Sequence, residues 1–337
     1  MLSPLLALMT AAAPTPTPAA PPPLYGLALV ANGPSKMGLA SLNLSTGSGK
    51  VIGPAHSEIF PAGDLVAVAN GVLHYLGDTA QGAVLVALNV TSGEKVCSAP
   101  VALREIGYVG MGQSLDFDAS SNSLILSGVA AQGPNATHAV YRAAADGKCG
   151  PFKLVGKFGD AAYIPMLHAS SLDVDGQRLF VQLATGQNTV AIGVIDLNQP
   201  TGKYLTVIDE GSSPDTSLLC MHWDKQTKRL LGVAAGSDGL TMHSLDPSGA
   251  GTWEPPKSLA HVPTYWNTLG GNEGTASAFD AQSRSLVVMA GHVDQHSGAE
   301  KLELATIDVD KLAVVSHPPL ASIGMKGCVD CLEGISF

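Results

Sequence analysis

The chain has 337 residues, of which 45% are hydrophobic, 14% charged and 5% aromatic, with 38 glycines and 22 prolines. Few charges and many glycines suit short strands joined by tight turns, and no long stretch has apolar residues at helical spacing, which excludes a helical protein. The net charge of −10 comes without a basic cluster and argues against nucleic acid or an anionic membrane as partner.

The first residues resemble a secretion signal followed by a linker. Residues 5–13 (LLALMTAAA) are apolar and end in small residues, as a signal peptide does before its cleavage site. We expect a signal peptide at residues 1–13, a proline-rich extended linker at 14–23 and one folded domain over 24–337. The apolar run is too short to span a bilayer, and no later run is long enough, so we expect no membrane span.

Three N-x-S/T sequons agree with a secretory route, at Asn43, Asn89 and Asn135. Such sequons also arise by chance, so they support the secretory interpretation without proving it. We expect a protein that is secreted or held in the lumen of the secretory pathway, and glycosylated there.

A sequence phrase of about fifty residues recurs along the chain. An apolar strand ends in an aspartate, a short polar turn follows, and a Leu-rich strand comes next. The sequence aligns four such aspartates, Asp118, Asp175, Asp224 and Asp280. Their recurrence at the same place indicates turn residues more than catalytic acids, and the same holds for the neighbouring carboxylates Asp116 and Asp173.

Between these copies lies a second shared phrase, an alternating strand that ends in a polar, glycine-containing turn. It leads into residues 91–94, 146–148, 200–203 and 247–249. Each unit therefore predicts a four-stranded antiparallel meander, which is the blade of a β-propeller.

Five units are complete, and they begin near Phe60, Gly112, His168, Asp215 and Glu273. Residues 24–52 supply the last three strands of a further unit, and residues 332–337 supply a first strand. We therefore predict an all-β, six-bladed propeller of four-stranded blades, closed by the C-terminal strand completing the N-terminal blade. The alternatives are seven blades or an irregular β-sandwich.

The phrases Leu172-Asp173-Val174-Asp175 and Ile195-Asp196-Leu197, the latter followed by Thr201-Gly202-Lys203, resemble the six-bladed TolB-like propeller superfamily. That superfamily includes the SMP-30/gluconolactonase, NHL-repeat and strictosidine-synthase-like groups. The resemblance extends over residues 24–337 but concerns only residues that build blades. A WD40 propeller is disfavoured, because the Trp-Asp pair occurs once, at Trp223-Asp224.

In a propeller the first strand of each blade lines the axis, where polar side chains from several blades converge. The residues in or just before these strands are Asp64, Gln113, His168, Asp215, Ser217, Asn272, Glu273 and Glu333, with Asn267 in a preceding loop. Carboxylates and amides around one axis would suit Ca²⁺ or another divalent metal. The SMP-30 resemblance implies Glu333, Glu273 and Asp215 as ligands. The alternative is that these groups bind water in the channel.

Other local patterns carry less chemistry. On a strand, His292, Asp294 and His296 would share one face as Zn²⁺ ligands, but the repeat places them in a hairpin, which favours a solvated loop. No nucleophile, P-loop or dinucleotide-binding motif is present.

The five cysteines leave at least one unpaired. We expect a local disulfide between Cys328 and Cys331 that fastens the ring closure, with free thiols, or redox or metal chemistry, as the alternatives. Cys97 and Cys149 are expected on outer strands of neighbouring blades, too far apart to bond. Cys220 is expected to be a buried apolar residue.

Taken together, these features favour a monomeric secreted propeller that binds a small molecule or a protein. The alternative is a divalent-metal-dependent hydrolase or lactonase of SMP-30 type, with its site on the axis.

Overall fold

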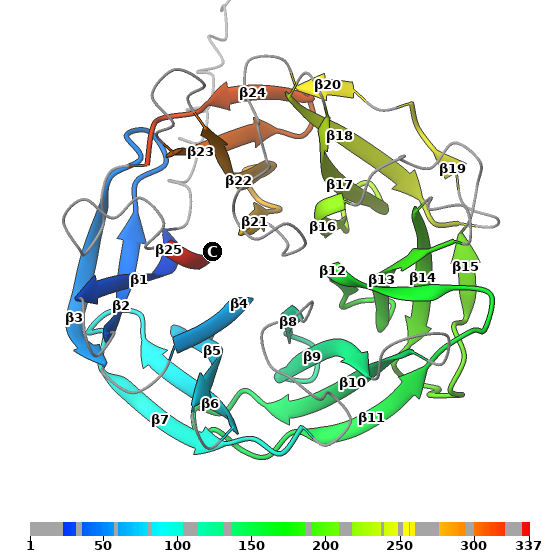
Figure 1. Ribbon diagram of the computed structural model, residues 1–337, viewed down its shortest axis with the longest axis horizontal. Coiled ribbons are helices and arrows are strands. Elements are labelled where there is room, and N and C mark those ends of the chain that lie inside the picture. Colours follow the sequence, from blue (N-terminus) through cyan, green and yellow to red (C-terminus); the bar gives the residue numbers. More distant parts are fainter. Residues whose placement is uncertain are drawn as a thin grey trace, which may run out of the picture.

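The computed structural model describes residues 23–31, 36–56, 60–79, 82–103, 114–130, 136–185, 190–208, 218–236, 239–248, 252–255, 257–259, 276–293, 300–320 and 332–337. These residues form six antiparallel sheets arranged as a ring around one axis (Figure 1). Within these ranges every regular element is a β-strand. The six-bladed fold predicted from the repeat is therefore confirmed, and no helix in the described parts could cross a membrane.

The strands of each blade follow one another from the axis of the ring to its rim. From inside to outside, blade 1 contains β25 (Leu332–Ser336), β1 (Leu24–Ala31), β2 (Lys36–Leu42) and β3 (Gly49–His56). Blade 2 contains β4 (Phe60–Ala69), β5 (Val72–Thr79), β6 (Gly82–Asn89) and β7 (Lys95–Pro100). Blade 3 contains β8 (Ser114–Asp118), β9 (Ser123–Ala130), β10 (Thr137–Ala144) and β11 (Lys153–Phe158).

The second half of the chain repeats this plan. Blade 4 contains β12 (Ile164–Asp173), β13 (Arg178–Ala184), β14 (Val190–Asp196) and β15 (Thr206–Ile208). Blade 5 contains β16 (Leu218–Asp224), β17 (Arg229–Gly236) and β18 (Gly239–Asp246), with β19 (Thr252–Trp253) and β20 (Lys257–Leu259) sharing its outer edge. Blade 6 contains β21 (Ser277–Asp280), β22 (Ser285–Val293), β23 (Glu300–Asp308) and β24 (Ala313–Ser316).

The ring closes as the sequence predicts, because the C-terminal strand β25 pairs with the N-terminal strand β1. Tyr25 lies opposite Ser336, and Gly26 lies opposite Ile335. β25 also lies beside β4 of blade 2 and β21 of blade 6, so the inner strands contact one another around the whole ring. Closure pairs β1 on both sides, with β25 on one side and β2 on the other, so β1 is not left as an edge strand.

The hydrophobic core is divided into six clusters, one at each interface between neighbouring blades. Alternate residues of a strand point to opposite faces of its blade, so each blade contributes to two clusters. In β9, for example, Leu124 and Leu126 pack towards blade 2, and Ile125 packs towards blade 4. The cluster between blades 1 and 6 contains Ile335 of the closing strand. The interfaces between blades therefore stabilise the whole ring by burying apolar surface.

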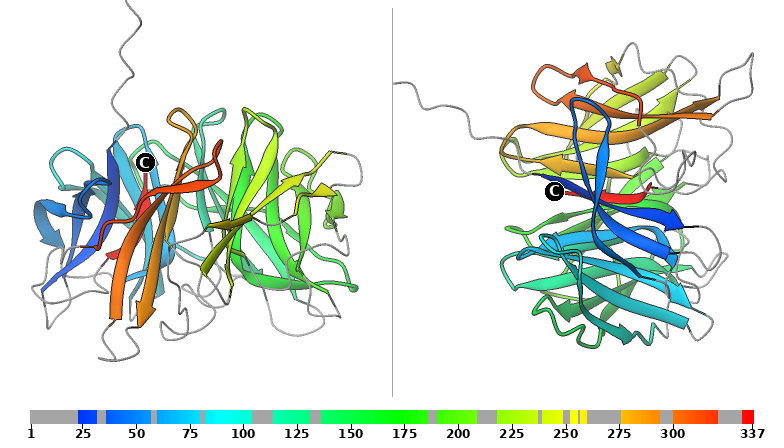
Figure 2. Two further views of the ribbon diagram at one scale, coloured as in Figure 1. Left: turned by 90° about the horizontal axis from the view of Figure 1, so that it is seen from above. Right: turned by 90° about the vertical axis from the view of Figure 1, so that its left-hand side faces the viewer.

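The antiparallel order gives the ring two different faces. At the turn face the inner strands end, and the third turn of every blade and the first turn of blades 2 to 6 lie there. At the loop face the inner strands begin, and there the outer strand of one blade connects to the next. In the left panel of Figure 2 the label at the C-terminus, at the end of β25, marks the turn face.

Buried aspartates form the first turns at the turn face. The carboxylate of Asp118 accepts hydrogen bonds from the backbone N–H of Ser120, and Asp224 does so from that of Gln226. The predicted alignment is wrong in one copy, because Asp173, and not Asp175, ends β12 and is buried. Asp175 is an exposed turn residue. A single residue separates the two aspartates, so the sequence alone does not show which of them ends the strand.

Some residues that end these turns reach back to the aspartate of the preceding blade. The side-chain amide of Gln177 donates to the Asp118 carboxylate at 3.1 Å, and Arg284 forms a 2.6 Å ion pair with Asp224. Both residues have a left-handed backbone, with φ of 49° and 58°. This conformation costs energy, which the contact between blades offsets.

The third turns also contact the preceding blade, and glycine permits the close approach. Gly93, in the turn between β6 and β7, has φ of 70°, and a Cβ atom there would lie 1.9 Å from the carbonyl oxygen of Ile52 in blade 1. His56 of blade 1 lies 2.9 Å from the Gly93 carbonyl oxygen through its Nε2 atom. Only a residue without a side chain fits this position.

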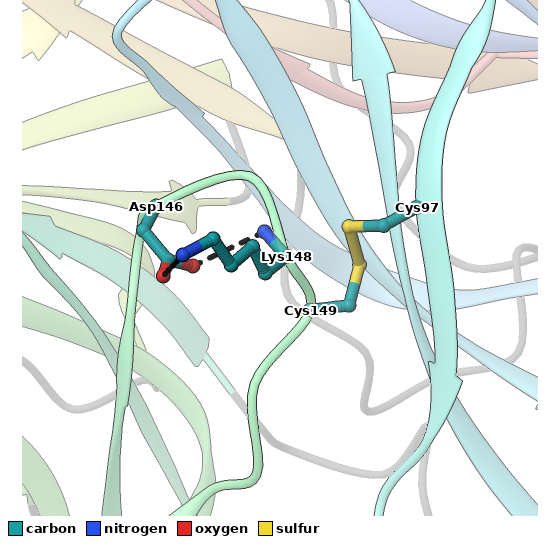
Figure 3. Close-up of a disulfide and its surroundings, with 4 residues drawn as sticks. All are labelled: Cys97, Asp146, Lys148 and Cys149. Carbon is teal, nitrogen blue, oxygen red and sulfur yellow. Dashed lines mark hydrogen bonds and ion pairs between the residues drawn. A yellow bond between two sulfur atoms is a disulfide. The ribbon is translucent and has the colours of Figure 1, made fainter.

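The same kind of contact corrects the cysteine prediction. Cys97 and Cys149 form a disulfide with a Cα–Cα distance of 5.8 Å (Figure 3). The prediction that they lie too far apart is wrong, because Cys149 belongs to the turn between β10 and β11 and not to an outer strand. That turn reaches the outer strand β7, so the bridge joins blade 3 to blade 2. Cys220 is buried in β16, as predicted.

Candidate functional site

The predicted axial residues belong to the inner strands and the connections before them. Asp64, His168 and Glu333 are in β4, β12 and β25, all inner strands, although their side chains lie outside the described parts of the structure. Gln113 and Ser217 directly precede β8 and β16, and like Asp215, Asn267, Asn272 and Glu273 they lie outside the described residues. The predicted convergence of these groups therefore stays a prediction.

Other predicted positions have similar outcomes. Asn43 follows β2 and Asn89 ends β6, whereas Asn135, Cys328 and Cys331 lie outside the described residues. His292 is in β22, while Asp294 and His296 fall between β22 and β23, also outside. His292 lies opposite Lys301 of β23 in the strand ladder and not in a loop as predicted, and the loop predicted for Asp294 and His296 stays a prediction. Among the described residues, no group of three His, Cys, Asp or Glu side chains could hold a metal ion.

The described polar groups of the inner strands mostly bind the neighbouring blade. The Ser171 hydroxyl accepts a hydrogen bond from the backbone N–H of Trp223 in blade 5, at 2.6 Å. In the same way the Ser336 hydroxyl of β25 accepts one from Val68 in blade 2, at 3.2 Å. These serines therefore contribute to the alignment of adjacent inner strands, a role that the sequence pattern does not reveal.

Asp116 is a chemically distinctive group that sequence reasoning missed. The repeat predicts a turn residue, but Asp116 lies within β8, and its Oδ2 atom accepts hydrogen bonds from Ser114 and from Ser170 of blade 4, each at 3.4 Å. The two serine hydroxyls also contact each other. Burial raises the pKa of Asp116 to about 7, although both hydroxyls act in the opposite direction.

This pKa gives Asp116 access to both protonation states near neutral pH. A carboxyl group of that kind can donate or accept a proton in general acid–base chemistry. It can equally bind a polar ligand as donor or acceptor. The sequence does not distinguish Asp116 from the turn residue Asp118, because both are aspartates next to Phe117.

A histidine marks the corresponding position in blade 5. The Nε2 atom of His222 lies 2.8 Å from the hydroxyl of Ser277 in blade 6. Burial lowers the pKa of His222 to about 4, so the ring is neutral at pH 7. Burial has the same effect on three further histidines. Together the four interior histidines are His74, His138, His222 and His243.

Comparison with known proteins adds to the fold but not to the chemistry. No family model matches the sequence, and no curated protein matches it. Several solved structures are similar in fold.

TolB from Acinetobacter baumannii is 12% identical with a TM-score of 0.52, over 93% of this chain and 66% of that chain. A protein described as a putative 6-phosphogluconolactonase from Bacteroides uniformis is 13% identical with a TM-score of 0.54, over 88% of this chain and 82% of the other. The periplasmic gluconolactonase of Pseudomonas aeruginosa is 14% identical with a TM-score of 0.51, over 93% and 98%.

These solved structures share the fold of this chain. At such low identity they show the fold alone. The chain spans 66% of the length of the A. baumannii TolB chain.

Proposed function

We propose that the chain is a secreted propeller that binds a small molecule or a protein on its loop face. The observation that carries this proposal is the difference between the two faces. The first turns at the turn face are short, as at Asn70–Gly71 between β4 and β5. The long connections begin and end at the loop face, and they are residues 101–113, 209–217, 260–276 and 317–331.

The sequence of these connections suits a binding surface. They contain acidic and amide groups, such as Asp215 and Asn272, together with the aromatic residues Tyr265 and Trp266. Varied loops on a rigid scaffold are where binding sites commonly form, and a few polar groups among apolar and aromatic ones fix a ligand. The blades beneath supply the rigidity, because their interfaces are apolar and hydrogen bonds join adjacent inner strands.

A ligand screen with matched variants tests this proposal. Thermal shift of the purified protein is measured with Ca²⁺ and with a panel of sugars, aldonolactones and amino acids. The screen is repeated on a loop-face variant, Asp215→Asn with Glu273→Gln, and on a turn-face variant, Glu94→Gln with Asp175→Asn. We expect the shift caused by a ligand to be lost in the first variant and kept in the second. The reverse pattern would place binding on the turn face and contradict the proposal.

The second candidate is a divalent-metal-dependent hydrolase or lactonase. It is favoured by the position of Glu333 in an inner strand, with Glu273 and Asp215 shortly before β21 and β16. Two proteins of similar fold are also named as lactonases, and one of them is a gluconolactonase. Asp116 would offer a group for proton transfer beside the axis.

Metal analysis and a lactonase assay separate the two candidates. A stoichiometric divalent ion that is lost in Glu333→Gln, together with hydrolysis of D-glucono-1,5-lactone, would establish the hydrolase. Metal-free protein whose melting is unchanged by EDTA, and which does not accelerate hydrolysis of the lactone over buffer alone, would contradict it. Size-exclusion chromatography with light scattering tests the proposed monomer.

A further inference from the structure

An Asn or Asp residue occupies one equivalent position in all six blades, at the start of the turn that follows the third strand. In each blade its Oδ1 atom accepts a hydrogen bond from the backbone N–H two residues further on, at 2.8 to 3.1 Å. In chain order the six residues are Asn43, Asn89, Asp146, Asp196, Asp246 and Asp308. The turn needs the acceptor oxygen, which both residue types provide.

The two residue types differ only in the atom that the turn does not need. Blades 3 to 6 have aspartate at this position, and blades 1 and 2 have asparagine. Each asparagine is followed two positions later by a hydroxyl residue, Ser45 after Asn43 and Thr91 after Asn89. The amide therefore occurs only where it completes an N-x-S/T sequon.

We propose that Asn43 and Asn89 carry N-linked glycans, and that these glycans lie on the turn face. The inference rests on the proposed secretory route. The sugar donor is an oligosaccharide attached to a lipid pyrophosphate. The Nδ2 atom forms a bond to the anomeric carbon and loses a proton, the carbon–oxygen bond breaks, and the lipid pyrophosphate leaves with its electron pair.

The geometry of both turns is compatible with this modification. The side chains of Asn43, Ser45 and Thr91 are exposed, and that of Asn89 is half-buried. In both turns Oδ1 is held by backbone N–H groups, from Ser45 at 2.9 Å and from Thr91 at 2.9 Å. A glycosylated asparagine keeps its carbonyl oxygen, so the turn keeps these hydrogen bonds.

The position of the glycans has a consequence for binding. The third turns lie on the face where the inner strands end, and β1 also begins there. Glycans at Asn43 and Asn89 would therefore lie at the outer part of the turn face, on blades 1 and 2, and leave the loop face open to a ligand. The third sequon, at Asn135, falls between β9 and β10, outside the described residues, and it is not part of this proposal.

The four blades that have aspartate at this position indicate the best test variant. Asn43→Asp and Asn89→Asp retain the acceptor oxygen and remove the amide, as in blades 3 to 6, so the turn should still form. Asn198→Asp is a matched control, because Asn198 is exposed and belongs to no sequon. The full-length chain with its own N-terminus is expressed in insect cells, and the protein is analysed by mass spectrometry before and after enzymatic removal of N-glycans.

We expect each aspartate variant to lose the mass of one glycan, the double variant to lose two, and the control to lose none. Unglycosylated double variant made in bacteria should melt within about 1 °C of the unmodified chain, since the turns are preserved. Secreted protein that carries no glycan at either position would overturn the inference and leave the proposed secretion intact. Protein that remains in the cytosol without glycans would overturn both.

Discussion

Removal of the Cys97–Cys149 bridge should lower the free energy of unfolding substantially. The bridge closes a chain segment with a sequence separation of 52 residues and joins the outer strand of blade 2 to a turn of blade 3. The loop-closure entropy of a segment of that length corresponds to about 4 kcal/mol at 25 °C. Because unfolded chains retain some contacts, we expect the double variant Cys97→Ala/Cys149→Ala to lose about 2 to 4 kcal/mol.

Urea unfolding followed by tryptophan fluorescence measures this loss. The midpoint is compared for the unmodified chain and the double variant, each with and without a phosphine reductant. Reductant should lower the midpoint of the unmodified chain towards that of the variant. Any effect of reductant that persists in the variant measures a second bridge, for which Cys328 and Cys331 are the predicted pair.

Tryptic mapping without reduction identifies the bridges directly. A bond between Cys97 and Cys149 links the peptides 96–104 and 149–153, whereas a bond between Cys328 and Cys331 stays within the peptide 327–337. Unlinked peptides 96–104 and 149–153, or a urea midpoint that reductant does not change, would refute the bridge between blades 2 and 3.

Three further predictions concern the interior of the ring. The four interior histidines have a pKa near 4 in the folded chain and near 6.5 in the unfolded chain, so the unfolded chain binds more protons between these pH values. The free energy of unfolding should therefore fall as the pH falls from 6.5 to 4, by up to about 3 kcal/mol for each histidine. Asp116 opposes this loss of stability over about pH 4 to 7, because its raised pKa favours the folded, protonated form. Urea midpoints that stay constant across pH 4 to 7 would contradict a net loss of stability. Arg284→Met leaves the buried carboxylate of Asp224 without its ion pair and should lower the free energy of unfolding by about 3 kcal/mol. An equal loss in a protein that already carries Asp224→Asn would show that the ion pair is not the cause. Gly93→Ala should cost about 2 kcal/mol more than Gly71→Ala, because both have a left-handed backbone but only Gly93 faces a carbonyl oxygen; equal melting temperatures would argue against that contact.

The architecture was predictable because blade building repeats. Strand, turn and strand recur with the same residue types, so the matching fragments at residues 24–52 and 332–337 indicate one shared blade. The closure that the fragments predict is seen in the pairing of Tyr25 with Ser336. A pattern that recurs six times constrains the fold strongly even when each copy is weak.

Contacts between blades were less predictable, because they depend on where a turn reaches. The repeat places Cys149 on an outer strand, but the residues after β10 form a turn that extends to blade 2. It also groups Asp116 with the turn aspartates, since nothing in the letters distinguishes a strand position facing Ser170 from a turn position. Such groups acquire their chemistry from the adjacent blade, which a repeat compared only with itself does not reveal.

Deletion of the closing strand tests most directly the claim that one blade is shared between the two ends of the chain. Protein lacking residues 1–23 is compared with protein that also lacks Leu332–Phe337. The first should melt close to the full-length chain, because its missing residues precede β1. The second loses the pairing of β25 with β1 and the buried Ile335, so we expect a melting temperature lower by more than about 10 °C, or no soluble monomer. Equal melting temperatures for the two proteins would contradict the closure.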